Sequence, residues 1–489
     1  MKAPFQLYID GRFESGAASF ESINPASGQG WAQMPEARSD EVNRAVEAAH
    51  RALHDPAWAE LTASQRGKLL YKLADLLEQA APELAAIETV DTGKIIRETR
   101  SQIAYVAEYY RYYAGVADKI EGQFIPVDKP DMNVWMTREP VGVVAAIVPW
   151  NSQLFLSAVK LGPALAAGCT VVLKASEEAP GPLLAFARVL DQVGFPAGVV
   201  NVITGFGPEC GAVLSSHPKV AHIAFTGGPE TAQRIVGNSA NNLAKVSLEL
   251  GGKSPLMVFA DADLDSAVNA QLAAVFAASG QSCVAGSRLL LQASIKDRFL
   301  ERLIEKVKAI RIGDPQDMAT EYGPLCTVRQ ISTIERVVAS SLAQGARLLV
   351  GGQRLEAVGH FYAPTVLDCS QAPQADSMRI ELFGPVLSVD VFHDEQDAIA
   401  KANDTDYGLA AGVFTTQLTR AHRLSKALRA GVVWLNTYRA ISPLASFGGF
   451  GLSGHGREGG LAAVLDYTTT KTVWLRTSDE PMADPFVMR

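Results

Sequence analysis

Five short apolar runs recur roughly every 25 residues through the middle of the chain, with amphipathic stretches between them. They are VGVVAAIVPW (141–150), CTVVLKAS (169–176), VVNVITG (199–205), HIAFTGG (222–228) and KVSLELGG (245–252). Strands of a parallel sheet are covered by helices on both faces, so they carry continuous Val, Ile and Leu rather than an alternating pattern. The spacing therefore predicts strand–helix–strand units that build a Rossmann-like sheet.

A second series of the same kind predicts a second α/β domain. Its strands are expected in GSRLLLQ (286–292), FGPVLSVDVF (383–392) and GVVWLNTY (431–438). Residues 40–115 place apolar side chains at three- and four-residue spacing, which is typical of helices. Two segments, 122–140 and 468–481, alternate apolar and polar residues like antiparallel strands. Because they flank the domains in sequence, we expect them to form a shared flap or an oligomer contact.

Composition narrows the class of protein. With 489 residues, 48% hydrophobic and 20% charged, the chain suits two or three globular domains. A net charge of −8 without a basic stripe argues against a nucleic-acid partner, because an acidic surface repels phosphates. We expect a cytoplasmic protein with no membrane partner, since no apolar signal segment is seen and residues 141–150 fall short of the roughly 20 that span a bilayer. The five scattered cysteines form neither a disulfide framework nor a CxxC zinc pattern, so no metal is predicted.

Several motifs lie where predicted strands end, which is where open α/β sheets bind nucleotides. The GxGxxG fingerprint is absent, since GFGPECG (205–211) has one residue too many before its last glycine. Lys174 and Glu177 follow the second strand, where a carboxylate can chelate ribose hydroxyls; a solvated surface pair is the alternative. Gly227 and Gly228 would let the backbone approach a pyrophosphate at a helix N-terminus, or they form a plain turn.

Three further residues have the chemistry of a catalytic site. Cys283 lies in the glycine-rich segment GQSCVAGSR (280–288) and is either a nucleophile or a buried small hydrophobe. Glu249 is an acid in an apolar strand; burial would raise its pKa and make it a general base, unless a structural ion pair holds it. Asn151 follows the first strand, and its amide either stabilises an oxyanion or caps a turn.

Eight motifs occur in order and at characteristic spacings along almost the whole chain, from YIDGRF to TTTKTVW. They are PWN, K-x-S-E, FTGG, LELGGKSP, GQSCVAGSR, ELFGPV (381–386), WLNTY (434–438) and FGGFGLSGHGRE (447–458). Together they resemble the NAD(P)-dependent aldehyde dehydrogenase superfamily. The resemblance implies an α/β, aldehyde dehydrogenase-like fold with three parts. These are a Rossmann-like NAD-binding domain (1–121 and 141–251), an α/β catalytic domain (252–467) and a small β oligomerisation flap (122–140 and 468–489).

The resemblance also implies residue roles. Cys283 matches the nucleophile, Glu249 the general base, and Asn151 the oxyanion donor together with the Cys283 N–H group. NAD is the expected cofactor, with NADP left open, because a carboxylate at Glu177 would repel a 2′-phosphate on the ribose. Gly228 stands where the family more often has the serine of FTGS, which removes one hydroxyl contact. The expected cofactor-binding residues are Ile147, Pro149, Trp150, Lys174, Ser176, Glu177, Phe225, Gly227, Gly228, Leu250, Gly251, Glu381 and Phe383.

The implied reaction is the NAD-dependent oxidation of an aldehyde to a carboxylic acid by a homodimer or a homotetramer. Cys283 would form a thiohemiacetal and then a thioester, which a Glu249-activated water hydrolyses; the glutamate favours hydrolysis over transfer to coenzyme A. The expected substrate-lining residues are Leu154, Val159, Ser282, Val284, Arg439, Ile441 and Phe447. Their mostly apolar character favours a medium apolar or aromatic aldehyde. The alternative is a semialdehyde whose carboxylate binds Arg439, unless Arg439 is a surface or interface residue.

Two rival classes would leave different features. A non-catalytic binding protein on the same fold would have lost Cys283, Glu249 or Asn151, and all three are present. A cofactor-independent cysteine hydrolase would need a histidine close to Cys283. Of the eight histidines, His455 alone falls within one of the motifs.

Overall fold

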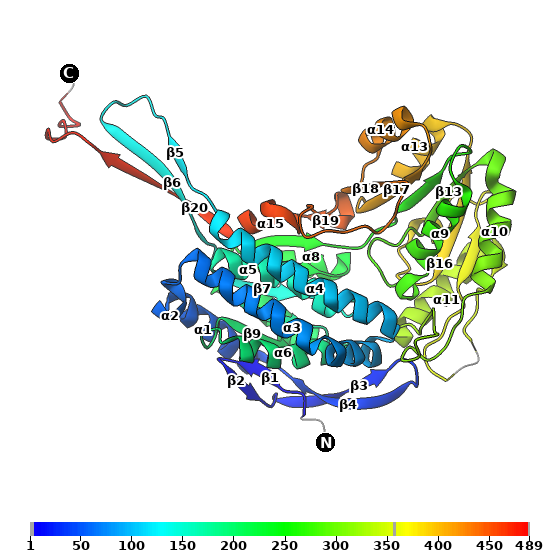
Figure 1. Ribbon diagram of the computed structural model, residues 1–489, viewed down its shortest axis with the longest axis horizontal. Helices are drawn as coiled ribbons and strands as arrows, with labels where there is room; N and C mark the ends of the chain where they lie inside the picture. Colours follow the sequence, from blue (N-terminus) through cyan, green and yellow to red (C-terminus); the bar gives the residue numbers. More distant parts are fainter. Residues whose placement is uncertain (1–3, 356–357, 488–489) are drawn as a thin grey trace.

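The computed structural model describes residues 4–355 and 358–487, and it places the predicted strands in two separate sheets (Figure 1). The first sheet has eight strands in the order β19-β11-β10-β7-β8-β9-β1-β2. Its five central strands are parallel, whereas β19, β1 and β2 run antiparallel to their neighbours. The strands are β1 (Leu7–Ile9), β2 (Arg12–Glu14), β7 (Val143–Ile147), β8 (Thr170–Ala175), β9 (Val200–Thr204), β10 (Val220–Thr226), β11 (Lys245–Glu249) and β19 (Gly454–His455). The predicted Rossmann-like sheet is confirmed.

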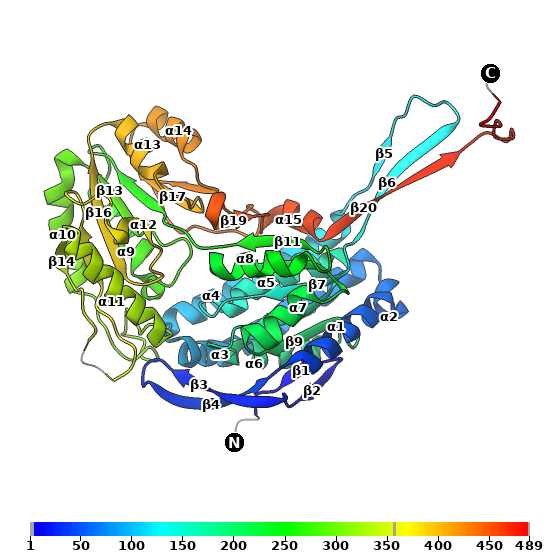
Figure 2. The ribbon, with the colours of Figure 1, turned by 180° about the vertical axis from the view of Figure 1, so that it is seen from behind.

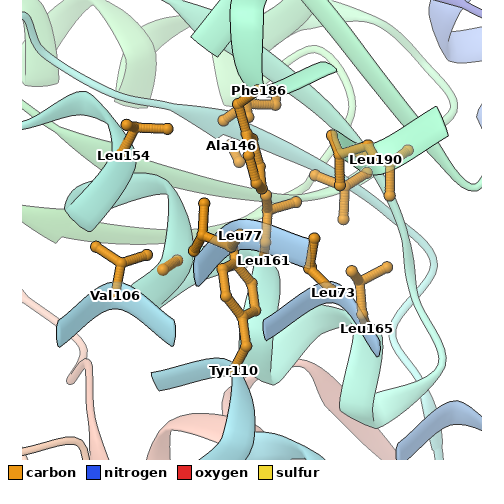
Figure 3. Close-up of a cluster of buried hydrophobic side chains, with 14 of the residues drawn as sticks. Leu73, Leu77, Val106, Tyr110, Ala146, Leu154, Leu161, Leu165, Phe186 and Leu190 are labelled. Atoms are coloured by element: carbon orange, nitrogen blue, oxygen red, sulfur yellow. The ribbon is translucent and has the colours of Figure 1, made fainter. Parts of the chain in front are cut away.

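Helices cover both faces of this sheet, which explains why its strands are apolar throughout. In β7, Val144 and Ala146 pack into one core, and Val143 and Ala145 pack into the other. The first core contains α3, α4, α5 and α6, and part of it is drawn in Figure 3; the second contains α1, α7 and α8. The helices are α1 (Ser39–His54), α2 (Pro56–Ala59), α3 (Ala63–Thr92), α4 (Ile96–Val116), α5 (Gln153–Ala167), α6 (Gly181–Val193), α7 (Ala212–Ser216) and α8 (Pro229–Ser239).

The second sheet has seven strands in the order β14-β15-β16-β13-β12-β17-β18, and only the β14–β15 pair within it is antiparallel. Its strands are β12 (Pro255–Val258), β13 (Arg288–Gln292), β14 (Arg347–Val350), β15 (Thr365–Asp368), β16 (Val386–Phe392), β17 (Ala410–Phe414) and β18 (Val432–Leu435). Its helices are α9 (Leu264–Val275), α10 (Lys296–Lys308), α11 (Val328–Ala343), α12 (Asp376–Arg379), α13 (Glu395–Asn403) and α14 (Leu418–Ala427). The second predicted α/β unit is therefore present.

The two alternating segments pair as expected from their pattern. β5 (Gln123–Ile125), β6 (Met132–Pro140) and β20 (Thr468–Arg476) form an antiparallel three-stranded ribbon that projects from the body of the molecule (Figures 1 and 2). Phe124, Trp474 and Leu475 are exposed on it. Its role in oligomerisation stays a prediction.

One segment lies in a different place from the predicted division of the chain. β19 pairs with β11 and extends the first sheet, although residues 252–467 were expected to belong to the second domain. The following α15 (Gly460–Asp466) also packs on the first domain, where Val464 and Tyr467 join the core of α3 to α6. The chain thus returns to the first sheet before it enters β20.

A hairpin of β3 (Ala18–Asn24) and β4 (Gln29–Glu36) forms a small sheet of its own. No helix within residues 4–355 and 358–487 is long and apolar enough to cross a membrane. All five cysteines are unpaired, and Cys283 is the one that is not fully buried.

Candidate active site

A cavity of about 530 Å³, called the inner cavity below, brings the three predicted catalytic residues together. Asn151 follows β7, Glu249 ends β11, and Cys283 lies in the loop between α9 and β13. The first sheet therefore supplies the acid and the amide, and the second domain supplies the thiol. A larger cleft of about 1020 Å³, called the outer cleft, shares Asn151 and Ser282 with the inner cavity and opens beyond it.

The chain approaches Cys283 through a left-handed turn. Ala278, Ser279 and Gly280 have φ values of 51°, 53° and 75°. A left-handed conformation costs roughly 1–2 kcal/mol for each residue that carries a Cβ. Two contacts hold the turn: a Glu98 Oε1 atom accepts the Ala278 N–H at 3.0 Å, and the Ser279 hydroxyl donates to the Gly323 carbonyl at 2.8 Å. Backbone strain of this kind is characteristic of functional sites.

The surroundings of Cys283 disfavour the thiolate form. Burial raises its pKa to about 12, and the nearby Glu381 and Glu249 carboxyl groups raise it further, while Arg439 opposes them. The thiol therefore needs a proton acceptor within the cavity before it can act as a nucleophile.

Glu249 is suited to accept that proton. Both of its carboxyl oxygens are buried and have no hydrogen-bond partner within residues 4–355 and 358–487. Burial raises its pKa well above the usual value of 4.5, and Glu458 adds to the rise, whereas Lys160 and Arg457 oppose it. A Cβ at Gly448 would lie 2.6 Å from Glu249 Oε1, so this glycine makes room for the carboxyl group. Among the described residues Glu249 has no ion-pair partner, so nothing supports its alternative role in a structural ion pair.

Lys160 and Glu458 near Glu249 were missed by the sequence prediction. Lys160 is fully buried in α5, donates to the Thr226 hydroxyl at 2.6 Å and pairs with the Glu458 carboxylate. A lysine within the apolar helix sequence LSAVKLGPALAA was the available signal. Its partner, Glu458, could not be predicted from the sequence, because it lies almost 300 residues further along the chain.

The two groups predicted to be oxyanion donors lie close to one another in the chain fold. Asn151 Nδ2 donates one proton to the Gln281 carbonyl at 2.9 Å, which fixes the amide beside the Cys283 loop. The N–H group of Cys283 has no acceptor among the described residues. Asn151 and Cys283 line the same cavity, so both could supply N–H donors to an oxyanion there.

The predicted cofactor residues lie along the carboxyl edge of the first sheet. Ile147, Lys174 and Phe225 are register partners on three adjacent strands, and Lys174 Nζ lies 3.2 Å from Glu177 Oε2. Ser176, like Glu177, directly follows β8. The inner cavity is lined by the remaining predicted residues, which are Pro149, Trp150, Gly227, Gly228, Leu250, Gly251, Glu381 and Phe383.

Two features fit a dinucleotide at this edge. Gly228 precedes α8, and a Cβ there would meet nothing within 4 Å, so its surroundings are open. Glu381 accepts the Gly252 N–H at 3.0 Å, and a Cβ at Gly251 would lie 1.8 Å from its carboxylate. The glycines therefore bring Glu381 against the sheet edge, and burial raises the pKa of Glu381 to about 7.

The predicted substrate residues divide into two groups. Val159, Ser282, Val284, Arg439, Ile441 and Phe447 line the inner cavity. Leu154 does not: its side chain is buried in the core beneath α5, near Phe186 (Figure 3). The neighbouring Phe155 lines the cavity instead, because consecutive residues of a helix point about 100° apart. Gln102, Tyr109 and Ser152 also reach the cavity and were not predicted.

No histidine of the described chain lines the inner cavity. His455 lies in β19 beside Leu248, with its Nε2 atom 3.0 Å from the Val246 carbonyl, and it is exposed. The arrangement that a cofactor-independent cysteine hydrolase needs is therefore not formed.

Comparison with known proteins agrees with this geometry. The sequence profile described as "Aldehyde dehydrogenase family" matches residues 13–473. The chain is 74% identical over 485 residues to (Z)-2-((N-methylformamido)methylene)-5-hydroxybutyrolactone dehydrogenase of Acinetobacter baylyi (strain ATCC 33305 / BD413 / ADP1), with 99% of each chain covered.

Solved structures of the same fold are close throughout. Betaine aldehyde dehydrogenase from Staphylococcus aureus in complex with NAD+ is 37% identical, with a TM-score of 0.97 and coverage of 100% of this chain and 98% of that one. PnpE from Pseudomonas sp. WBC-3 is 43% identical, with a TM-score of 0.95 and coverage of 99% and 100%.

Proposed function

The chain belongs to the aldehyde dehydrogenase family, and from this premise we propose that it oxidises an aldehyde to the carboxylic acid with NAD+. The observation that supports this most directly is the convergence of Cys283, Glu249 and Asn151 in one cavity. The same cavity contains Gly228 and Glu381, which are among the residues proposed to hold the cofactor.

The residues of the site divide the reaction between them. Glu249 takes the proton of Cys283, and the sulfur attacks the aldehyde carbon to form a thiohemiacetal. Asn151 and the Cys283 N–H group stabilise the negative charge on oxygen; loss of one such donor costs about 10²–10³ in rate. NAD+, when bound, would supply the hydride acceptor, and loss of hydride from the substrate carbon would leave a thioester on Cys283. After releasing that first proton to solvent, Glu249 removes a proton from water, which attacks the thioester; the Cys283 thiolate leaves and the carboxylic acid is released.

Lys174 and Glu177 are proposed to hold the adenosine ribose, and Glu381 the nicotinamide ribose. A carboxylate at Glu177 disfavours a 2′-phosphate by charge repulsion, so NAD+ is preferred over NADP+. An oligomer built through the β5–β6–β20 ribbon and a cytoplasmic location complete the proposal.

For the substrate, the carboxylate-bearing alternative has the stronger support. A 5-hydroxybutyrolactone, the ring named in the Acinetobacter baylyi relative, is the closed form of a 4-oxo acid, so opening the ring gives an aldehyde and a carboxylate together. Arg439 lines both the inner cavity and the outer cleft. Its Nη1 atom donates to the Ala273 carbonyl at 3.0 Å, while its Nη2 and Nε atoms have no partner among the described residues. Phe155, Val159 and Phe447 support the apolar or aromatic aldehyde.

An aldehyde panel tests the proposal. The purified protein is mixed with NAD+ and 4-oxobutanoate, hexanal or benzaldehyde, and NADH is followed by absorbance. We expect the highest kcat/KM for 4-oxobutanoate, and no NADH from Cys283→Ala with any substrate. In Arg439→Gln the KM for 4-oxobutanoate should rise about tenfold, the scale of a hydrogen bond to a charged group, with hexanal unchanged. A preference for hexanal, together with no effect of Arg439→Gln, would favour the apolar aldehyde as substrate. Turnover by Cys283→Ala would refute the proposed mechanism.

A further inference from the structure

A buried polar cluster on the wall of the inner cavity has no part in the mechanism above. Lys94 is 5% exposed, and its ammonium group donates to Glu88 Oε1 at 3.1 Å, to Gln102 Oε1 at 2.5 Å and to the Ser152 hydroxyl oxygen at 3.1 Å. Gln102 and Ser152 line both the inner cavity and the outer cleft. The cluster therefore begins in the protein interior and ends at the substrate space.

The hydrogen bonds of Ser152 fix what it presents to that space. Its oxygen accepts from Lys94 Nζ and also from Gln102 Nε2 at 3.3 Å. A hydroxyl group has two acceptor lone pairs and one donor, so both lone pairs are occupied. The hydroxyl hydrogen is left to donate, and no acceptor for it exists among residues 4–355 and 358–487. The lysine behind the oxygen makes that hydrogen a stronger donor, because hydrogen bonds in a chain polarise one another.

We propose that Ser152, held by Lys94 and Gln102, binds an acceptor oxygen on the carbon chain of the substrate. The ligand class is an amide carbonyl oxygen, and a plain hydrocarbon chain would leave the donor without a partner at a cost in free energy. Because Ser152 directly follows Asn151, the recognised oxygen belongs to a substituent near the aldehyde carbon. Arg439 binds the carboxylate of the proposed 4-oxo acid, so Ser152 and Arg439 recognise two different groups of the substrate. This inference rests on the proposed function and names a second determinant of its substrate.

Two aldehydes that differ in one substituent test the inference. The first is 4-oxobutanoate, and the second is the 4-oxo acid that carries an (N-methylformamido)methylene group at carbon 2, supplied as its hydroxybutyrolactone. In Ser152→Ala we expect kcat/KM for the substituted compound to fall between about threefold and tenfold, the range of one hydrogen bond, with 4-oxobutanoate changed less than twofold. Ser152→Thr keeps the hydroxyl group and should keep the discrimination. Ser101→Ala, an exposed serine in the outer cleft one residue from Gln102, is the matched control and should change neither value.

Each outcome decides a different point. Equal losses for both compounds in Ser152→Ala, or no loss for either, would overturn the inference and leave the proposed function standing. Recovery of discrimination in Ser152→Thr together with loss in Gln102→Leu would support the whole cluster. If the wild-type protein forms no NADH from either compound, the proposed substrate class is wrong and the inference is overturned with it.

Discussion

The left-handed turn before Cys283 predicts a positioning role for Glu98, which is far from the sulfur in sequence. In Glu98→Ala, the Ala278 N–H group loses its carboxylate acceptor. A hydrogen bond to a charged group contributes about 1.5–3 kcal/mol, and the turn contains two left-handed residues with a Cβ, Ala278 and Ser279, at roughly 1–2 kcal/mol each. The lost bond is therefore comparable to the strain that it offsets.

We expect kcat in Glu98→Ala to fall by up to about 30-fold, which corresponds to about 2 kcal/mol, because the loop leaves the geometry that aligns Cys283 with Asn151. The KM for NAD+ should change less than twofold, since Glu98 is not part of the nucleotide edge. Glu98→Gln keeps an oxygen acceptor and should lose only about threefold, the scale of a neutral hydrogen bond.

A rescue experiment separates positioning from general damage. Glycine at residue 278 removes the left-handed cost of roughly 1–2 kcal/mol and adds about 0.4–1 kcal/mol of unfolded-chain entropy. The Glu98→Ala, Ala278→Gly double variant should therefore recover about fivefold in kcat over Glu98→Ala, although the hydrogen bond is not restored. Steady-state kinetics and thermal melting would be measured for these variants, with the exposed Glu108→Ala on the same helix as control. If Ala278→Gly lowers kcat in both backgrounds alike, the strain reasoning is refuted.

Four further predictions follow from burial. In Glu249→Gln, the first turnover should give one NADH per subunit and deacylation should then slow by about 10²–10⁴; in the wild type deacylation should rise with pH, because the raised pKa keeps Glu249 protonated at low pH. A raised pKa means that the folded state binds the proton of Glu249 more tightly than the unfolded state does, so Glu249 destabilises the fold increasingly above its unfolded pKa. Glu249→Gln should therefore raise Tm at pH 8 more than at pH 5. Equal shifts of Tm at both pH values would contradict a buried charge at Glu249. Alkylation of Cys283 by iodoacetamide in the free protein should speed up about tenfold per pH unit between pH 7 and 10, as a thiol pKa of about 12 requires, and a plateau near pH 8 would show the thiolate to be stabilised. Leu154→Ala should cost about 2–5 kcal/mol of stability, whereas Phe155→Ala should change aldehyde kinetics with little loss of Tm; the reverse pattern would mean that the two side chains are misassigned.

The sequence predicts the strands better than it predicts which side chains line the cavity. The strand β7 can be predicted from its apolar run, because helices cover both faces of the sheet. The end of that run also predicts the position of Asn151 at the edge of the sheet. β19 could not be predicted from the sequence, because a two-residue strand with one glycine has no periodicity. Leu154 was placed in the substrate space because a motif fixes the position of α5 along the chain but does not fix which of two neighbouring apolar residues faces the cavity.

The polar partners show a second limit of sequence patterns. Lys160 and Glu458 are separated by almost the whole second domain, and only the return of the chain to the first sheet brings them together. Lys94 lies between α3 and α4, and Ser152 directly precedes α5, so the two meet through the packing of α4 beside α5. Buried charges of this kind depend on tertiary contacts, which no local pattern records.

The return of the chain at β19 and α15 has a consequence for synthesis on the ribosome. The domain that emerges first lacks an edge strand, and its core lacks Val464 and Tyr467, until about 95% of the polypeptide has been made. Glu249 is translated halfway along the chain, and Gly448 and Glu458, which enclose it, arrive some 200 residues later. A nascent chain therefore carries an open sheet edge, and from the middle of its translation also an unenclosed Glu249, and both are closed only near the end.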